Sequence, residues 1–187
     1  MVILKPITLN DWRVDWLRKQ RNRPELMKYF RQNSILSYTD QRRWFLSLDR
    51  NKSKLFTIHL KDDPDHKILG YCGLSPIDIR HLHAEFGIFI VPEEVGKGYG
   101  TSAMSELLSF GFNGLALKKI YSDVLDYPKE NRFEFYKKLG FKEEGKLRKH
   151  YFKDNKWIDS IVFSMLSEEY AKNKNLLGFR EPEVSVA

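Results

Sequence analysis

The segment "IVPEEVGKGYGTSAM" (residues 90–104) constrains the fold more than any other part of the chain. It carries glycine at the alternate positions Gly96, Gly98 and Gly100, between an apolar run and an amphipathic one. Glycine is costly in backbone entropy, so such a cluster usually marks a positive φ or a close approach of another molecule to the main chain. The segment predicts a strand, a short loop and the start of a helix.

Hydrophobic patterning along the rest of the chain alternates between strand and helix signals. In the first expected helix, Thr8 and Asp11 resemble a capping pair, while Trp12, Trp16 and Leu17 share a face. Strands are expected at 3–7, 54–60, 67–74, 83–91 and 118–125, and in a hairpin over 144–166 that turns at Asp154-Asn155. Helices are expected at 8–20, 25–30, 38–51, 100–117 and 130–140.

This order of elements predicts the fold class. Helices come early, an antiparallel meander follows, and a βαβα unit and a hairpin close the chain, which is typical of a mixed α/β (α+β) domain. A hydrophobic content of 42% in 187 residues is enough for a compact core. We expect one domain over residues 1–170 and a C-terminal tail over residues 171–187, where the periodicity is lost.

The charge balance indicates a mild preference for anionic partners. Lys and Arg number 32 against 25 Asp and Glu, spread along the chain, which suits nucleic acid or a phosphorylated cofactor. No stretch approaches the ~20 apolar residues of a transmembrane helix. The single cysteine, Cys72, lies in a strand pattern and suits a buried thiol in a reducing compartment. We therefore expect a cytoplasmic protein that does not bind membranes.

The glycine cluster can be interpreted as one of three kinds of phosphate-binding loop. A fourth interpretation is a glycine-rich turn without function. A Walker loop requires Ser or Thr after its lysine, but Lys97 is followed by Gly98. "GYGTSA" (residues 98–103) fits the dinucleotide pattern weakly, and "PEEVGK" (residues 92–97) separates it from the preceding strand. The third interpretation is a helix N-terminus whose backbone N–H groups bind a pyrophosphate, and we favour it.

Two segments together carry a family resemblance. "PEEVGKGYGTSAMSELLSFGF", followed by "NRFEFYKKLGFKEEG", resembles the acetyl-CoA signature of the GNAT superfamily of N-acetyltransferases. The segment "AEFGIFIVPE" and the last hairpin resemble the branch that holds ribosomal-protein alanine, spermidine and amino-sugar nucleotide acetyltransferases. The resemblance implies a GNAT fold, a mixed and mostly antiparallel central sheet with helices on both faces. It also implies acetyl-CoA as co-substrate and a primary amine as acceptor.

The resemblance also assigns roles to individual residues. It implies that Tyr136 donates a proton to the CoA sulfur, which is chemically reasonable because a phenol titrates near pH ~10. Two positions depart from the family pattern. Val95 stands where relatives carry Gln or Arg, and Lys129 stands where many carry an Asn, with Asn131 shifted nearby. The residues expected to contact the cofactor are Ile90, Val91, Val95, Gly96, Lys97, Gly98, Tyr99, Gly100, Thr101 and Asn131.

Glu85 is the candidate general base. In "HAEFGIFIV" it shares one strand face with Gly87 and Phe89, and a carboxylate in a central strand is costly without a partner or a purpose. A base, a ligand for a cationic substrate and a structural ion pair all remain open. His81 and His83 have metal-like spacing, but nothing completes a ligand set, so no metal site is expected.

The acceptor is the least readable part of the function. The segments "RNRPELMKYF" and "YTDQRRWF" resemble enzymes that act on amino-sugar nucleotides, which makes a small-molecule amine of that class the leading expectation. Alternatives are a spermidine-like polyamine, the N-terminal alanine of a ribosomal protein, and a basic RNA-binding module without catalysis. As an enzyme, the protein is expected to bind no nucleic acid, and the prediction is compatible with a homodimer.

Overall fold

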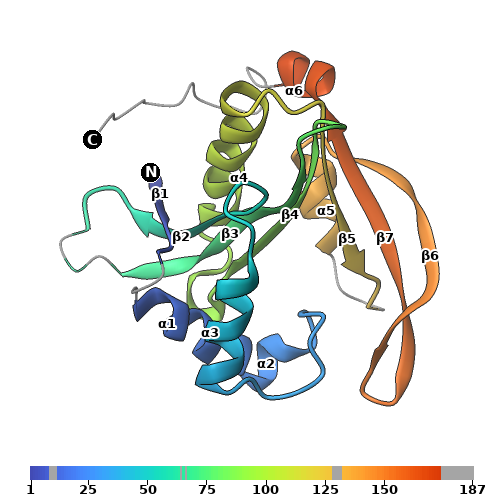
Figure 1. The fold of residues 1–187 in the computed structure, drawn as a ribbon. Coiled ribbons are helices and arrows are strands. Elements are labelled where there is room, and N and C mark those ends of the chain that lie inside the picture. The colour runs from blue at the N-terminus through green and yellow to red at the C-terminus, as the bar shows by residue number, and fades with distance from the viewer. Residues whose placement is uncertain (9–11, 64, 66, 128–131, 174–187) are drawn as a thin grey trace.

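The computed structural model describes residues 1–8, 12–63, 65, 67–127 and 132–173 (Figure 1). Within them, one sheet has the strand order β1-β2-β3-β4-β5-β7-β6. Its strands are β1 (Val2–Pro6), β2 (Lys54–Leu60), β3 (Ile68–Asp78), β4 (His83–Ile90), β5 (Lys119–Leu125), β6 (Lys142–Lys153) and β7 (Lys156–Leu166). The helices are α1 (Trp12–Arg21), α2 (Pro24–Met27), α3 (Tyr38–Ser47), α4 (Tyr99–Ser109), α5 (Arg132–Lys138) and α6 (Ser167–Asn173), with short turns η1 (Pro92–Glu94) and η2 (Phe110–Gly114).

The sheet is antiparallel except at one junction. β1 to β4 form a meander and β5, β7 and β6 a second antiparallel group. The two groups join where His83–Glu85 of β4 pair in parallel with Lys119–Tyr121 of β5. Beyond Glu85 the two strands diverge, as Figure 1 shows. The predicted fold class, a mixed and mostly antiparallel sheet, is confirmed.

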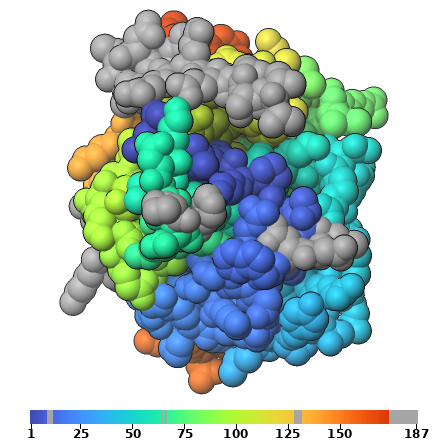
Figure 2. Space-filling model, turned by 90° about the vertical axis from the view of Figure 1, so that its left-hand side faces the viewer, coloured from blue at the N-terminus to red at the C-terminus, as the bar shows by residue number. Residues whose placement is uncertain are grey.

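Helices cover both faces of the sheet, and alternation along β4 assigns its side chains to them. On one face, Phe89 stacks on Trp16 of α1 with ring centroids 6.1 Å apart. On the other face, Phe86 packs against Tyr136 of α5 at 5.7 Å. Seen from the β1 side, the residues coloured blue to cyan, which include α1 to α3, form the lower part and right-hand side of the surface (Figure 2). The larger core lies on the α4 and α5 side.

The last hairpin turns where the sequence predicts. Asp154 and Asn155 have φ of 48° and 59°, the left-handed pair that a tight two-residue hairpin turn requires. In the middle of β6, before the turn, the register with β7 shifts between Leu147 and Tyr151, and Lys149 has φ 51°. This bulge bends β6 and re-aims the side chains beside it.

Four helix expectations differ from the structure, and one of them is the third helix, which ends at Ser47 instead of residue 51. In α1 the buried residues are Val14 and Leu17, while Trp12 begins the helix and is 64% exposed, so the predicted face is wrong at that position. The second helix is shorter than expected and covers only Pro24–Met27. The fourth leaves α-helical geometry after Ser109 and closes with the wider turn η2. The expected cap at Asp11 lies outside the described residues.

Two further expectations concern burial and membranes. Cys72 is fully buried, and burial raises the pKa of its thiol, as suits an unreactive core cysteine. Among the described residues, no helix combines the length and apolar character needed to cross a membrane.

Candidate active site

The glycine loop adopts a conformation that only glycine takes readily. Gly96 and Gly98 have φ of 85° and 81°, and a side chain at either would point into open space. Gly98 is the N-cap of α4, and no described side chain caps the helix there. The first N–H groups of α4 are therefore left for another acceptor, at the positive end of the helix dipole. This arrangement fits a pyrophosphate.

At Gly100 neither the backbone nor the packing requires glycine, because a Cβ there would make only ordinary van der Waals contacts. Its φ is not positive, and a Cβ there would meet Ile90 at 3.5 Å and Phe135 at 3.6 Å. The start of α4 thus packs closely between the end of β4 and α5. Of the other loop residues expected to contact the cofactor, Val95 and Thr101 are exposed and Tyr99 is half-buried.

Glu94 fixes the loop, and sequence reasoning did not single it out. Its buried carboxylate accepts hydrogen bonds from Lys67 at 2.5 Å and from Lys97 at 2.8 Å. These two ammonium groups hold the pKa of Glu94 below its ordinary value. The carboxylate ties the start of β3 to the glycine loop, and it also holds Lys97, one of the residues expected to contact the cofactor.

The end of β4 offers backbone groups to the gap beside β5. The N–H of Val91 donates to the carbonyl of Leu69 at 2.9 Å and is thus committed to the sheet. Because the N–H groups of an antiparallel strand alternate in direction, that of Ile90 faces the opposite edge, where β5 has diverged. Ile90 and Val91 were both expected to contact the cofactor, and of these two only Ile90 has its N–H on that edge.

Tyr136 lies on the α4 and α5 side of the sheet. Its half-buried ring is surrounded by aromatic rings, with Phe163 at 5.5 Å and Phe135 at 5.3 Å. Burial raises the pKa of the hydroxyl, an effect that Arg132 partly offsets. The hydroxyl therefore stays protonated at neutral pH, which is the state a proton donor needs.

Glu85 lies on the opposite face of the sheet, beside a second carboxylate. Asp123 of β5 follows two residues after Tyr121, the parallel partner of Glu85, so all three point to the same side. Arg31 bridges the two carboxylates, donating to Glu85 from both terminal nitrogens and to Asp123 from one. The Glu85 and Asp123 side chains are only 15% and 12% exposed. We call this the Glu85–Asp123 acid pair.

The ionisation of this group follows from burial and pairing. Burial raises the pKa of Glu85 above its ordinary value, and the contact with Arg31 only partly reverses this. For Arg31, burial lowers the pKa, but the bond to Glu85 and the two negative charges more than compensate, so the pKa is raised. Arg31 therefore stays charged, and Glu85 is a stronger base than an ordinary carboxylate.

The acid pair lies in a cavity of about 240 Å³, which we call the acceptor cavity. The hydroxyl of Tyr151 donates to Asp123 at 2.5 Å, and the His150 Nε2 atom lies 3.9 Å from the same carboxylate. Both come from the bulged part of β6. The cavity is lined by Arg31, Glu85, Tyr121, Asp123, His150 and Tyr151, with Leu147 and Val162 as apolar wall.

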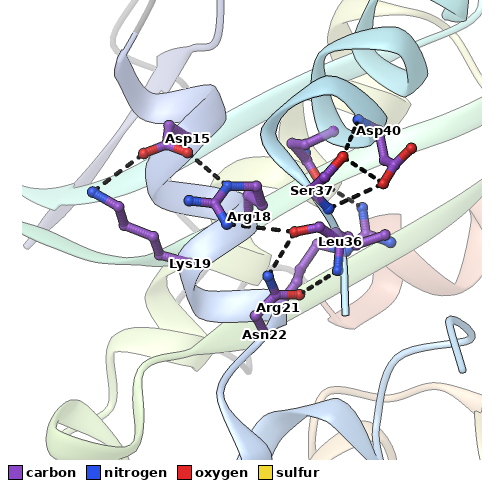
Figure 3. A network of polar contacts seen from close by, with 9 residues as sticks. Asp15, Arg18, Lys19, Arg21, Asn22, Leu36, Ser37 and Asp40 are labelled. Carbon is purple, nitrogen blue, oxygen red and sulfur yellow. Dashed lines mark hydrogen bonds and ion pairs between the residues drawn. The ribbon is translucent and has the colours of Figure 1, made fainter. Parts of the chain in front are cut away.

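The segment that carries Arg31 is held at both ends. Figure 3 shows the side-chain amide of Asn22 bonded twice to the backbone of Leu36, at 2.8 and 2.9 Å, which closes the loop between α1 and α3. Ser37 and Asp40 form a capping box that starts α3 directly afterwards. Because both ends of the segment between Asn22 and Ser37 are held, the possible positions of Arg31 within it are restricted.

Two further hydrogen bonds tie the same segment to the ends of β5 and β6. Tyr127, after β5, donates to the carbonyl of Lys28 at 2.8 Å. The buried Lys153 at the end of β6 donates to the carbonyl of Gln32. Arg31 lies between these two attachments, so its guanidinium is presented to the acid pair by an anchored backbone.

Comparisons with known proteins identify the family. The family model described as "Acetyltransferase (GNAT) domain" matches residues 2–142. The chain belongs to the GNAT acetyltransferase family. Spermidine N(1)-acetyltransferase of Escherichia coli (strain K12) is 28% identical over 177 residues, which cover 90% of this chain and 88% of that protein. The uncharacterized N-acetyltransferase p20 of Bacillus licheniformis is 29% identical over 175 residues, covering 90% and 94%.

A solved structure agrees with the fold. The crystal structure of spermidine N-acetyltransferase from Vibrio cholerae, in complex with CoA and spermine, superposes with a TM-score of 0.82. Sequence identity is 24%, over 91% of this chain and 98% of that chain. As a member of this family, the protein is an acetyl-CoA-dependent N-acetyltransferase. The alternative expectation, an RNA-binding module without catalysis, is therefore wrong.

The glycine loop fits this co-substrate, because its uncapped helix end and left-handed glycines leave backbone N–H groups for a pyrophosphate. Asn131, the last expected cofactor contact, lies outside the described residues. The sequence analysis predicted neither Arg31 nor Asp123 as a site residue. For Asp123 the sequence does contain a signal, because the alternation in "YSDVL" puts it on one face with Tyr121.

Proposed function

We propose that this GNAT acetyltransferase acetylates a primary amine of an aliphatic polyamine. The observation that carries the proposal is the acid pair: two neighbouring, mostly buried carboxylates at the point where β4 and β5 diverge. A cationic amine is the ligand that such a site favours. The similarity to spermidine N-acetyltransferases over 90% of the chain supports the same acceptor class.

The same carboxylates argue against an amino-sugar nucleotide, the leading expectation from the sequence. A nucleotide sugar carries a diphosphate, and negative charge in a cavity with two carboxylates is repelled. Arg31 is the one cation that hydrogen-bonds the acid pair within the part of the chain described, and both carboxylates hold it. The polyamine alternative is therefore better supported than the amino-sugar interpretation.

The two faces of the sheet carry different groups for the reaction, a proton acceptor on one face and a proton donor on the other. Acetyl-CoA supplies the thioester: the amine nitrogen bonds to the acetyl carbon, the carbon–sulfur bond breaks, and the amide and the thiol of CoA result. Glu85 lies on the acceptor face, and its raised pKa suits it to take up the proton that the amine loses. Tyr136 lies on the other face and holds a proton for the departing sulfur. The N–H of Ile90 faces the gap between them.

A substrate panel tests the acceptor. Thiol release would be followed with putrescine, spermidine, amino-sugar nucleotides and peptides that begin with Ala or Ser. Turnover is expected with the polyamines. Asp123→Asn is expected to raise the KM for the polyamine and to leave the KM for acetyl-CoA unchanged. Asp49→Asn, which removes an exposed carboxylate after α3, is the matched control. Turnover confined to the peptides or to the sugar nucleotides would refute the proposal.

A further inference from the structure

The acceptor cavity holds three formal charges in direct contact. Glu85 and Asp123 are negative and Arg31 is positive, which leaves one negative charge without a counter-charge among them. His150 adds a positive charge only when it is protonated. The reacting amine must be neutral to attack a thioester, so the remaining negative charge matches one further ammonium group of the acceptor.

Arg31 occupies this position from a fixed backbone. Its side chain is 50% exposed, yet the carbonyls of Lys28 and Gln32 on either side are bound by Tyr127 and Lys153. The Arg31 guanidinium also lies 5.9 Å from the centre of the Tyr151 ring. These contacts keep Arg31 at the acid pair, where it uses carboxylate oxygens that would otherwise bind ammonium groups.

The inference rests on the proposed function and specifies its substrate class. We propose that Arg31 determines acceptor specificity, because it takes the place at the acid pair that a second ammonium group of the acceptor would occupy. The enzyme then prefers diamines, which carry one ammonium beside the reacting amine, to triamines and tetraamines. A second ammonium in the cavity would meet the guanidinium and be repelled.

The experiment compares acceptors that differ mainly in charge. Values of kcat/KM would be measured with butylamine, putrescine, spermidine and spermine for the parent enzyme, R31Q, R31K and D123N. We expect R31Q to raise kcat/KM for spermine relative to putrescine by about tenfold, as removal of one like charge should. R31K keeps the charge and the parent's order of preference. D123N removes one negative charge and moves the preference toward butylamine.

Arg23 supplies a matched control on the same segment. It also bridges two carboxylates, Glu25 and Glu93, each 2.6 Å away, and it is not a lining residue of the acceptor cavity. R23Q changes the net charge as R31Q does and is expected to leave the order of acceptors unchanged. The control therefore separates a local effect from one of overall charge.

Calorimetric titration of spermine into the parent and into R31Q supplies a readout that does not need turnover. If the parent acetylates no polyamine, the proposed function fails, but spermine binding about tenfold tighter to R31Q would still support the role of Arg31. If R31Q lowers kcat/KM equally for all acceptors, or binds spermine no more tightly than the parent, Arg31 is a structural residue and the inference is overturned. Melting temperatures of all variants would verify folding.

Discussion

Tyr136 combines an apolar setting with a protonated hydroxyl. Its ring is fixed by Phe86, Phe163 and other aromatic neighbours, so the hydroxyl has a defined direction. Burial raises its pKa, which keeps the proton in place through neutral and mildly alkaline pH. Among the residues that the structure describes, none hydrogen-bonds the Tyr136 hydroxyl, which is therefore available to a substrate atom.

Tyr136→Phe is expected to lower kcat by ~10²–10⁴, the usual loss for a positioned acid. The ring and its packing are retained, so the melting temperature and the KM for acetyl-CoA should change little. Steady-state rates and thermal melts of both proteins measure this. The loss should shrink with an acetyl thioester of a more acidic thiol, because a better leaving group needs less protonation. A lower melting temperature with near-normal kcat would instead return Tyr136 to a packing role.

The connection between β4 and α4 is an element whose shape depends on both glycine and charge. Gly96 and Gly98 allow the turn, and Glu94 anchors it through Lys67 and Lys97. The two lysines lower the pKa of Glu94 in the folded protein below its ordinary value of 4.5. A lowered carboxyl pKa stabilises the fold above the unfolded-state pKa, and this stabilisation is lost as pH falls through the folded-state pKa.

Glu94→Gln is therefore expected to lower the melting temperature near neutral pH and to have progressively less effect below pH ~4.5. Melting curves of the parent and the variant between pH 3 and 7 measure the difference directly. Glu134→Gln is the control, since its exposed carboxylate forms only a 3.7 Å pair with Lys137 and should matter little throughout. If the difference in melting temperature between the parent and Glu94→Gln stayed constant over the whole pH range, the ionised Glu94 carboxylate would not be the stabilising group.

At the level of the complete molecule, the divergence of β4 and β5 links the two halves of the sheet to the site. The strands pair only over His83–Glu85 and Lys119–Tyr121, so the two antiparallel groups meet along a short junction. A ligand held by the start of α4 and reaching Tyr136 of α5 would contact elements from both sides of that junction. Binding of acetyl-CoA is therefore expected to stabilise the whole fold.

Saturation with CoA at ~100 times its dissociation constant should stabilise the parent by roughly 2.7 kcal/mol. Gly98→Val is expected to abolish this stabilisation, because the branched side chain would enter the open space beside the helix N-terminus. Asn155→Val is the matched control: it imposes the same left-handed strain at φ 59°, in the distant hairpin turn. Thermal melts with and without CoA measure both. A folded Gly98→Val variant with the parent's CoA response would show that the loop does not bind the pyrophosphate.

Local patterns in the sequence determined much of the framework. Alternation and helical spacing predicted the strands, the order of elements and the turn at Asp154-Asn155, because these depend on residues close together in the chain. The left-handed glycines at 96 and 98 likewise follow from a local backbone requirement. Where a helix end or a buried face depends on distant packing, as with Trp12 and the end of α4, the local pattern was misleading.

The arrangement around the Glu85–Asp123 acid pair, which we propose as the acceptor site, was decided by the tertiary structure. Arg31 lies 54 residues from Glu85 and 92 from Asp123 in the sequence, and no local pattern connects them. They meet because a parallel register sets Glu85 beside Tyr121, a closed loop carries Arg31 across the sheet, and a bulge in β6 turns Tyr151 toward Asp123. The sequence alone therefore predicted that the Glu85 carboxylate lies in a central strand and requires a partner. Its partners depend on strand register and loop closure, which are properties of the assembled sheet.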